Sequence, residues 1–104
     1  MQLEDGEVQK GKWIINCLLD NNRLNGKFIV TDKNVYYDID NVFSATGIGG
    51  ADGLIKFSRA EIAKVETYSA FWIFKRFRIT LKDGKEYVFD RGIMPTSPIV
   101  SLLK

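Results

Sequence analysis

The 104-residue sequence has no histidine, a single cysteine and only two prolines. The absence of histidine excludes Ser-His-Asp and Cys-His catalysis, histidine metal sites and imidazole pH sensing. One cysteine excludes an intrachain disulfide and a multi-cysteine zinc site. No apolar run approaches the roughly 20 residues that cross a bilayer, and the acidic start is unlike a signal peptide. We therefore expect a cytoplasmic, non-enzymatic protein without metal or cofactor.

What is present is the composition of a soluble globular domain, 45% hydrophobic and 27% charged. A chain of this size buries roughly two thirds of its unfolded surface, which is enough for one core. We expect one domain over residues 1–104, with residues 1–8 as a flexible tail. The charges that sum to the net +2 are distributed unevenly along the chain. Residues 1–52 carry five basic and eight acidic side chains (net −3), and residues 53–104 carry ten and five (net +5).

Apolar residues alternate with polar ones in seven short runs, a pattern typical of strands. Turn-forming residues separate the runs, and the glycine-containing stretch 40–53 is expected to be a mobile surface loop. Ser97 and Pro98 have the character of an N-cap and a first-turn proline, which predicts a short packed C-terminal helix. Hairpin-length links without alternating helices favour an antiparallel barrel or sandwich. The runs lie at about residues 13–19, 28–30, 35–39, 55–57, 62–68, 77–81 and 87–89.

The last hairpin, around residues 82–84, admits two registers. A two-residue turn would place the aromatic side chains of the final strand on the same face as the arginines. A three-residue loop with a left-handed glycine instead pairs Phe77 with Phe89 on the inside and Arg76 with Asp90 on the outside. We predict the second register because it buries the aromatic rings and pairs opposite charges.

Three segments have the order and spacing of one known family. Residues 26–37 (GKFIVTDKNVYY) flank a Thr-Asp turn with hydrophobic residues, residues 57–66 (FSRAEIAKVE) lead into the fifth strand, and residues 79–89 (ITLKDGKEYVF) form an Asp-Gly hairpin. Together they resemble the GRAM family within the pleckstrin-homology (PH)-like fold, over roughly residues 7–104. Arg59 is a departure, because it stands where that family usually has leucine.

The resemblance implies an all-β (β-rich α+β) domain, a PH-like seven-stranded antiparallel barrel of two orthogonal sheets with a short C-terminal capping helix. It also implies a non-catalytic module that binds lipids, proteins or both. Lipid-binding PH domains hold inositol phosphates with basic residues around the first hairpin. The corresponding loop here offers Arg23 and Lys27 as a secondary basic candidate, and two spaced cations make a poor polyphosphate clamp. Phosphoinositide binding is therefore not carried over.

Residues 71–78 are the most unusual segment, because they combine aromatic and basic side chains at one point of the chain. An exposed aromatic tip backed by cations would suit a protein partner or an anionic membrane surface. Two alternatives remain: the strands run long and bury both faces, or the rings contact another copy of the chain in a structural homo-oligomer. The candidate contact residues are Phe71, Trp72, Phe74, Lys75, Arg76 and Arg78.

Other features favour unremarkable roles. Single-stranded nucleic-acid binding would need interleaved aromatic and basic residues, which only segment 71–78 offers, and the net charge is low for a phosphate footprint. The glycines of residues 47–53 lack a following helix and fit a link better than a phosphate loop. We expect Cys17 to lie in the core. We expect Asp38 and Asp40 to lie on a solvated edge that blocks strand association.

Overall fold

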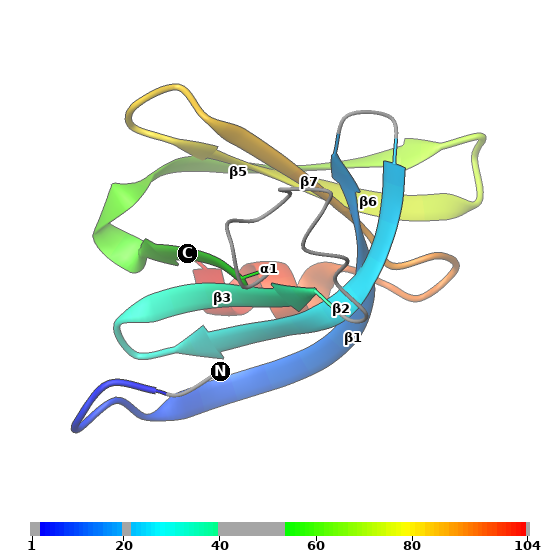
Figure 1. Cartoon of the computed structure of the whole chain (residues 1–104). Coiled ribbons are helices and arrows are strands. Elements are labelled where there is room, and N and C mark those ends of the chain that lie inside the picture. The colour runs from blue at the N-terminus through cyan, green and yellow to red at the C-terminus, as the bar shows by residue number, and fades with distance from the viewer. Residues whose placement is uncertain (1–2, 20–21, 40–53, 104) are drawn as a thin grey trace.

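The computed structural model describes residues 3–19, 22–39 and 54–103. Its strands form one antiparallel sheet in the order β4-β3-β2-β1-β7-β6-β5, and a helix follows the last strand (Figure 1). The fold is therefore mostly β, as the alternating apolar pattern predicts. The elements are β1 (Gln9–Leu19), β2 (Asn22–Thr31), β3 (Asn34–Ile39), β4 (Leu54–Ser58), the 3-10 turn η2 (Arg59–Glu61), β5 (Ile62–Ala70), β6 (Phe74–Leu81), β7 (Glu86–Asp90) and α1 (Ser97–Leu103).

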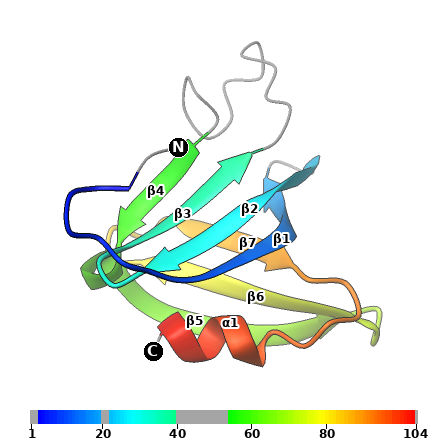
Figure 2. The same cartoon turned by 90° about the horizontal axis from the view of Figure 1, so that it is seen from below.

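The sheet bends over one core, with β2 to β4 on one side and β5 to β7 on the other (Figures 1 and 2). Aromatic rings from the two sides pack against each other in this core. The centroid of the Phe28 ring lies 5.4 Å from that of Phe77 and 4.9 Å from that of Phe89. The Phe57 ring stacks on the Tyr87 ring at 5.5 Å between centroids. Edge-to-face and stacked pairs of this kind stabilise a core beyond the area they bury.

The expected closed barrel of two sheets is not what forms. Closure would require β4 to pair with β5. In the described part of the chain these two strands are the outer members of one continuous sheet, and β5 bonds only to β6. The 3-10 turn η2 carries the chain from the end of β4 into β5, which pairs along β6 and not with β4.

The predicted register of the last hairpin is confirmed. Phe77 lies opposite Phe89 and Arg76 opposite Asp90. Gly84 has the left-handed φ of 92° that the three-residue loop requires, and the Leu81 N–H donates to the Lys85 carbonyl at 2.8 Å. Burial of the aromatic residues on one face therefore selected the register.

Gly26 shows how closely β2 and β3 approach each other. A Cβ at this buried position would lie 2.5 Å from the Asp38 carbonyl oxygen and 2.8 Å from the Tyr37 ring. Neither neighbour can move freely, because the first is backbone and the Tyr37 hydroxyl donates to the Ile15 carbonyl at 2.8 Å. We predict that Gly26→Ala lowers the free energy of unfolding by about 1–3 kcal/mol, measured by urea denaturation. A variant as stable as the parent would contradict this packing.

The C-terminal helix packs against the core, as its apolar spacing predicts, and it begins at Ser97. The Thr96 carbonyl accepts from the N–H groups of Ile99 and Val100, both at 3.0 Å, so Thr96 rather than Ser97 caps the helix. Arg59 anchors the other end, donating to the Leu102 carbonyl and, at 3.3 Å, to the Thr31 carbonyl. The residue that departs from the family pattern thus ties α1 to the β2–β3 hairpin.

The segment expected to be a flexible tail makes specific contacts from Glu4 onward. Its main anchor is the Glu7 carboxylate, which accepts from the Tyr36 hydroxyl at 2.6 Å, the Asn34 amide at 2.9 Å and the Thr31 hydroxyl. The burial of Glu7 raises its pKa, but these donors outweigh that effect and lower the pKa to about 2.

The hydrogen bonds to Glu7 predict that the stability of the fold decreases in acid. Because the pKa of Glu7 is lower in the folded than in the unfolded chain, its stabilisation is present above about pH 4.5 and is lost as the pH falls toward 2. We expect Glu7→Gln to be less stable than the parent at pH 7 and to show a smaller loss between pH 7 and pH 3, measured by urea unfolding at both values. Parallel losses in the two proteins would count against the network.

Candidate functional site

The loop between β5 and β6 presents apolar side chains to solvent. Ala70 and Phe74 form the last pair of the two strands, so residues 71–73 make the tip of the hairpin. Phe71 is 80% exposed and Trp72 is 93% exposed, whereas the ring of Phe74 packs edge-on against Phe71 at 6.3 Å. Figure 1 shows this tip extending beyond the body of the sheet. The strands therefore do not run long and bury these rings.

Two other segments bring apolar side chains to the same end. The loop after β7 begins beside the hairpin, because the Lys75 N–H donates to the Gly92 carbonyl at 2.7 Å (Figure 2). On β1, Asn16 lies opposite Asp90, so the antiparallel register directs the preceding residues of β1 toward the same end. We call this surface the apolar end, and it consists of Ile14, Phe71, Trp72, Ile73, Ile93 and Met94, all exposed.

The hairpin tip has an unfavourable backbone conformation for its residues. Phe71 and Trp72 have φ values of 52° and 70°, in the left-handed region that glycine and asparagine occupy at low cost. This conformation costs a bulky residue roughly 1–2 kcal/mol. Such strain at an exposed apolar tip favours a functional contact, because Trp72 is 93% exposed and Phe71 stays 80% exposed despite its contact with Phe74.

Arg76 serves the domain rather than a ligand. Its Nε donates to the fully buried Asp90 carboxylate at 2.7 Å, which also accepts from Arg23 at 3.2 Å and from the Gly92 N–H at 2.6 Å. Burial raises the pKa of Asp90, but these donors outweigh it and hold that pKa below its usual range. Arg76 is therefore a neutralised cation.

Arg78 is also paired within the sheet. It donates from both Nε and Nη2 to the Glu66 carboxylate, at 3.2 and 3.0 Å, and holds the pKa of that carboxyl below its usual range. Its Nε lies 3.8 Å from Glu86, and its guanidinium lies 5.9 Å from the ring centre of Tyr68. Two of the three candidate cations of segment 71–78 thus have internal partners.

Lys75 is the cation of this segment that remains available. It is half-buried beside the hairpin tip, and Lys12 is exposed on β1 two residues before Ile14. In the ranges described here, neither ammonium group has a hydrogen bond or ion pair. Arg91 lies two residues before Ile93 and donates to the Pro95 carbonyl. Each apolar segment therefore has a cation two positions away.

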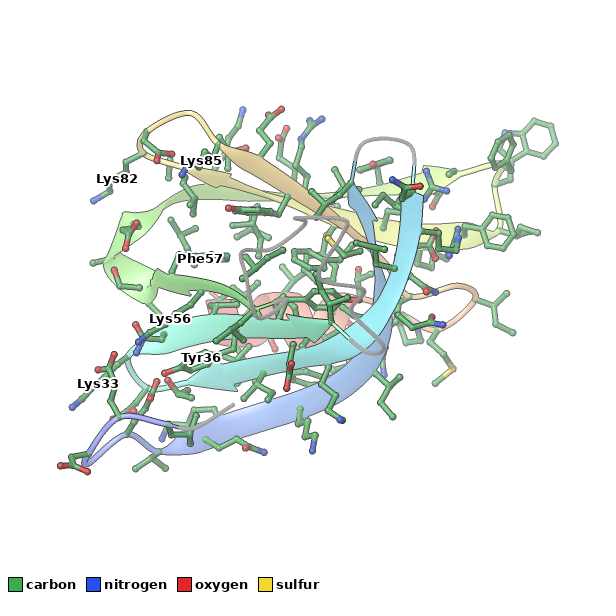
Figure 3. All side chains as sticks on the ribbon, viewed as in Figure 1. Lys33, Tyr36, Lys56, Phe57, Lys82 and Lys85 are labelled. Atoms are coloured by element: carbon green, nitrogen blue, oxygen red, sulfur yellow. The ribbon has the colours of Figure 1, made fainter. Side chains whose placement is uncertain are left out.

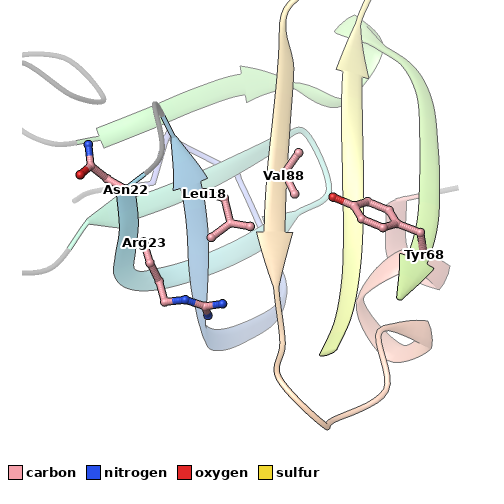
Figure 4. A pocket seen from close by; sticks show the side chains of 5 residues that line it. All are labelled: Leu18, Asn22, Arg23, Tyr68 and Val88. Carbon is pink, nitrogen blue, oxygen red and sulfur yellow. The ribbon is translucent and has the colours of Figure 1, made fainter. Parts of the chain in front are cut away.

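The secondary basic candidates do not converge. Arg23 and Lys27 lie four positions apart on β2, about 13 Å in an extended strand, and Arg23 is committed to Asp90. Arg23 also borders an open hollow of about 450 Å³ on the outer face of the sheet (Figure 4). Apolar side chains form part of this hollow, so it is not an anion clamp. The lining residues are Leu18, Asn22, Arg23, Tyr68 and Val88.

The remaining sequence candidates fall outside any site. Cys17 is buried in the core as predicted, and burial raises its pKa to about 12, so the thiol is unreactive. The expected solvated edge is wrong for Asp38, which is half-buried in β3 between β2 and β4. Asp40 and the glycines of residues 47–53 lie outside the described residues. Among the residues with described positions, no three acidic or cysteine side chains gather where they could hold a metal ion. No helix in those same ranges is long and apolar enough to cross a membrane.

Comparison with known proteins supports the fold alone. No family model and no curated protein matches the sequence. The crystal structure of the C-terminal domain of an unknown protein from Leishmania infantum is similar, with a TM-score of 0.74 and 9% identity over 94% of this chain and 83% of that chain. At this identity the likeness concerns the path of the chain and assigns no function.

Sequence reasoning located the hairpin tip but missed half of the apolar end. Ile14, Ile93 and Met94 are distant from residues 71–73 in sequence, and only the pairing of β1, β7 and β6 brings them together. An available signal was that Ile14 has the opposite parity to the buried residues of β1 and must therefore point outward.

Proposed function

We propose that this protein is a non-catalytic binding module of the PH-like, GRAM-like class and that it contacts its partner through the apolar end. The observation that carries the proposal is the gathering of six exposed apolar side chains from three segments at one end. Isolated exposed apolar residues are ordinary, but Phe71, Trp72 and Ile73 are adjacent at the tip, and adjacent exposed apolar side chains mark an interaction surface. Aromatic residues at the centre of such a surface commonly dominate binding energy.

The assignment to a PH-like class draws on topology. The three family-like segments coincide with the β2–β3 hairpin, the passage through η2 into β5, and the β6–β7 hairpin. The seven antiparallel strands and the packed helix of the described residues support the implied architecture. The open sheet edge between β4 and β5 is the difference from the expected barrel.

Self-association through the same surface is the alternative, and the charges oppose it. A two-fold pair would bring the patch that contains Lys75 and Arg91 in one copy against the same positively charged patch of the other. The segments 67–82 and 91–103 contain no carboxylate to separate those charges. We expect a monomer in sedimentation velocity, and a dimer dissolved by Trp72→Ser would favour the alternative. Nucleic-acid binding is opposed because Arg76 and Arg78 are already paired.

The proposal can be tested by measuring how much protein and lipid the immobilised domain retains from an extract of its host. The parent protein and a Phe71→Ser/Trp72→Ser variant are immobilised at equal density and exposed to host extract that includes membranes. We expect the variant to retain much less protein and lipid than the parent, because the contact loses its two most exposed rings. A Lys82→Ser/Lys85→Ser variant, changed at the opposite hairpin, should retain as much as the parent. Equal retention by the parent and the tip variant would contradict the proposal.

A further inference from the structure

The hairpin tip and the loop after β7 carry charge of one sign. Lys12, Lys75 and Arg91 each lie two residues from an apolar member of the surface. The two segments that supply the hairpin and the following loop, residues 67–82 and 91–103, contain no acidic residue. The neighbouring Asp90 is fully buried and bonded to Arg76. The hairpin tip and the following loop therefore present cations beside their apolar side chains, whereas the face of Ile14 also carries Lys27 and Asp38.

The opposite end of the molecule has a different character. Figure 3 shows Lys33, Lys56, Lys82 and Lys85 away from the hairpin tip, at the other end of the sheet. Carboxylates accompany two of these lysines, since Lys56 pairs with Glu4 at 2.6 Å and Lys85 lies 3.9 Å from Asp83. Basic residues alone do not distinguish the apolar end; the combination of unpaired cations with exposed apolar side chains does.

The shape of the apolar end favours a fluid partner. The hairpin tip protrudes from the sheet in both views (Figures 1 and 2), and its most exposed residue is Trp72. Tryptophan prefers the headgroup level of a bilayer, and neighbouring phenylalanine and isoleucine side chains gain from entering the acyl boundary. A protein partner would need a matching concavity, whereas a bilayer deforms around a protruding loop.

We infer that the apolar end inserts into the interface of an anionic lipid bilayer, and this inference rests on the proposed function. Phe71, Trp72 and Ile73 enter the interface, and Lys12, Lys75 and Arg91 attract the lipid charge. The three cations lie on separate segments, so they respond to the charge of the surface rather than clamp one headgroup. Anionic lipids of the cytoplasmic leaflet supply such a surface.

Sedimentation with vesicles tests this inference on the full chain. The vesicles are phosphatidylcholine alone, or phosphatidylcholine mixed with either phosphatidylserine or phosphatidylglycerol at equal charge. We expect binding to both anionic mixtures, weakened by added salt, and little binding to phosphatidylcholine. Phe71→Ser/Trp72→Ser should lower the partition coefficient about 100-fold. Each substitution removes most of the favourable free energy of transferring that ring from water into the bilayer.

Charge-reversal variants test whether binding depends on the cations near the apolar end or only on the net positive charge of the protein. Lys12→Glu/Lys75→Glu should lower binding to anionic vesicles at least about 30-fold, whereas the matched Lys82→Glu/Lys85→Glu variant, with the same net charge, should bind nearly as the parent does. Equal losses in the two variants would overturn the inference, as would binding to phosphatidylserine but not phosphatidylglycerol. If the parent binds no vesicles but still retains host protein through the tip, the bilayer inference fails and the proposed function stands. If tip-dependent retention is also absent, both fail.

Discussion

A protein in which Phe71 is replaced by asparagine and Trp72 by glycine is expected to fold more stably and to lose its association with anionic vesicles. Both native residues occupy left-handed backbone conformations, which asparagine and glycine adopt at lower cost than phenylalanine and tryptophan. Relief of this strain should raise the free energy of unfolding by about 1–2 kcal/mol. The same change removes the two most exposed rings, so partition into anionic vesicles should fall about 100-fold.

Urea unfolding and vesicle sedimentation of the Asn-Gly variant measure the two effects separately. The matched control is Ile93→Ser/Met94→Ser, which removes exposed apolar side chains where no positive φ occurs. The control should weaken vesicle binding without raising stability. A gain in stability coupled to a loss of binding cannot arise from misfolding. An Asn-Gly variant that is less stable than the parent, or that binds vesicles equally well, would contradict the functional role of the strained tip.

Asp90→Ala is expected to lower the free energy of unfolding by about 3–5 kcal/mol at neutral pH. The carboxylate is fully buried, and its removal leaves the half-buried Arg76 without its anion and the Gly92 N–H without its acceptor. Breaking a buried pair costs more than the pair contributes, because the remaining charge loses water and partner together. The change also frees Arg23 from the only carboxylate to which it is paired in the described structure.

Urea denaturation of Asp90→Ala beside Asp83→Ala checks this expectation. Asp83 is exposed, lies 3.9 Å from Lys85 and accepts the Lys85 N–H at 3.0 Å, so its removal should lower the free energy of unfolding by no more than about 1 kcal/mol. Because the pKa of Asp90 is lowered in the folded protein, the contribution of Asp90 is present above about pH 4 and is lost as the pH falls. The parent and Asp90→Ala should therefore converge in acid. Similar losses for the two variants at pH 7 would refute the role of Asp90.

Local rules predicted the strands and one hairpin in detail. The pairing of Phe77 with Phe89 followed from burying rings on one face, and Gly84 supplied the required backbone conformation. The same register placed Asp90 opposite Arg76 on the outer face. Its complete burial was not predictable from alternation, because Arg23 arrives from β2 to cover it.

The properties that depend on distant segments were not predictable in this way. Sheet closure depends on whether β4 meets β5, which are strands at opposite edges of the sheet. The apolar end depends on the register between β1 and β7, which brings Ile14 toward the hairpin tip. The sequence placed the cations of segment 71–78 beside its aromatic tip, but cross-strand carboxylates such as Glu66 engage two of them.

Fluorescence of Trp72 in a Trp13→Phe variant tests most directly whether the apolar end is the contact surface. Trp72 is then the sole tryptophan, and its 93% exposure gives it the emission of a water-exposed indole in the free protein. During titration with phosphatidylcholine–phosphatidylserine vesicles, we predict a shift to shorter wavelength and quenching by lipids brominated near the headgroup. Emission that stays that of an exposed indole, with no quenching by the brominated lipid, would contradict contact through the apolar end.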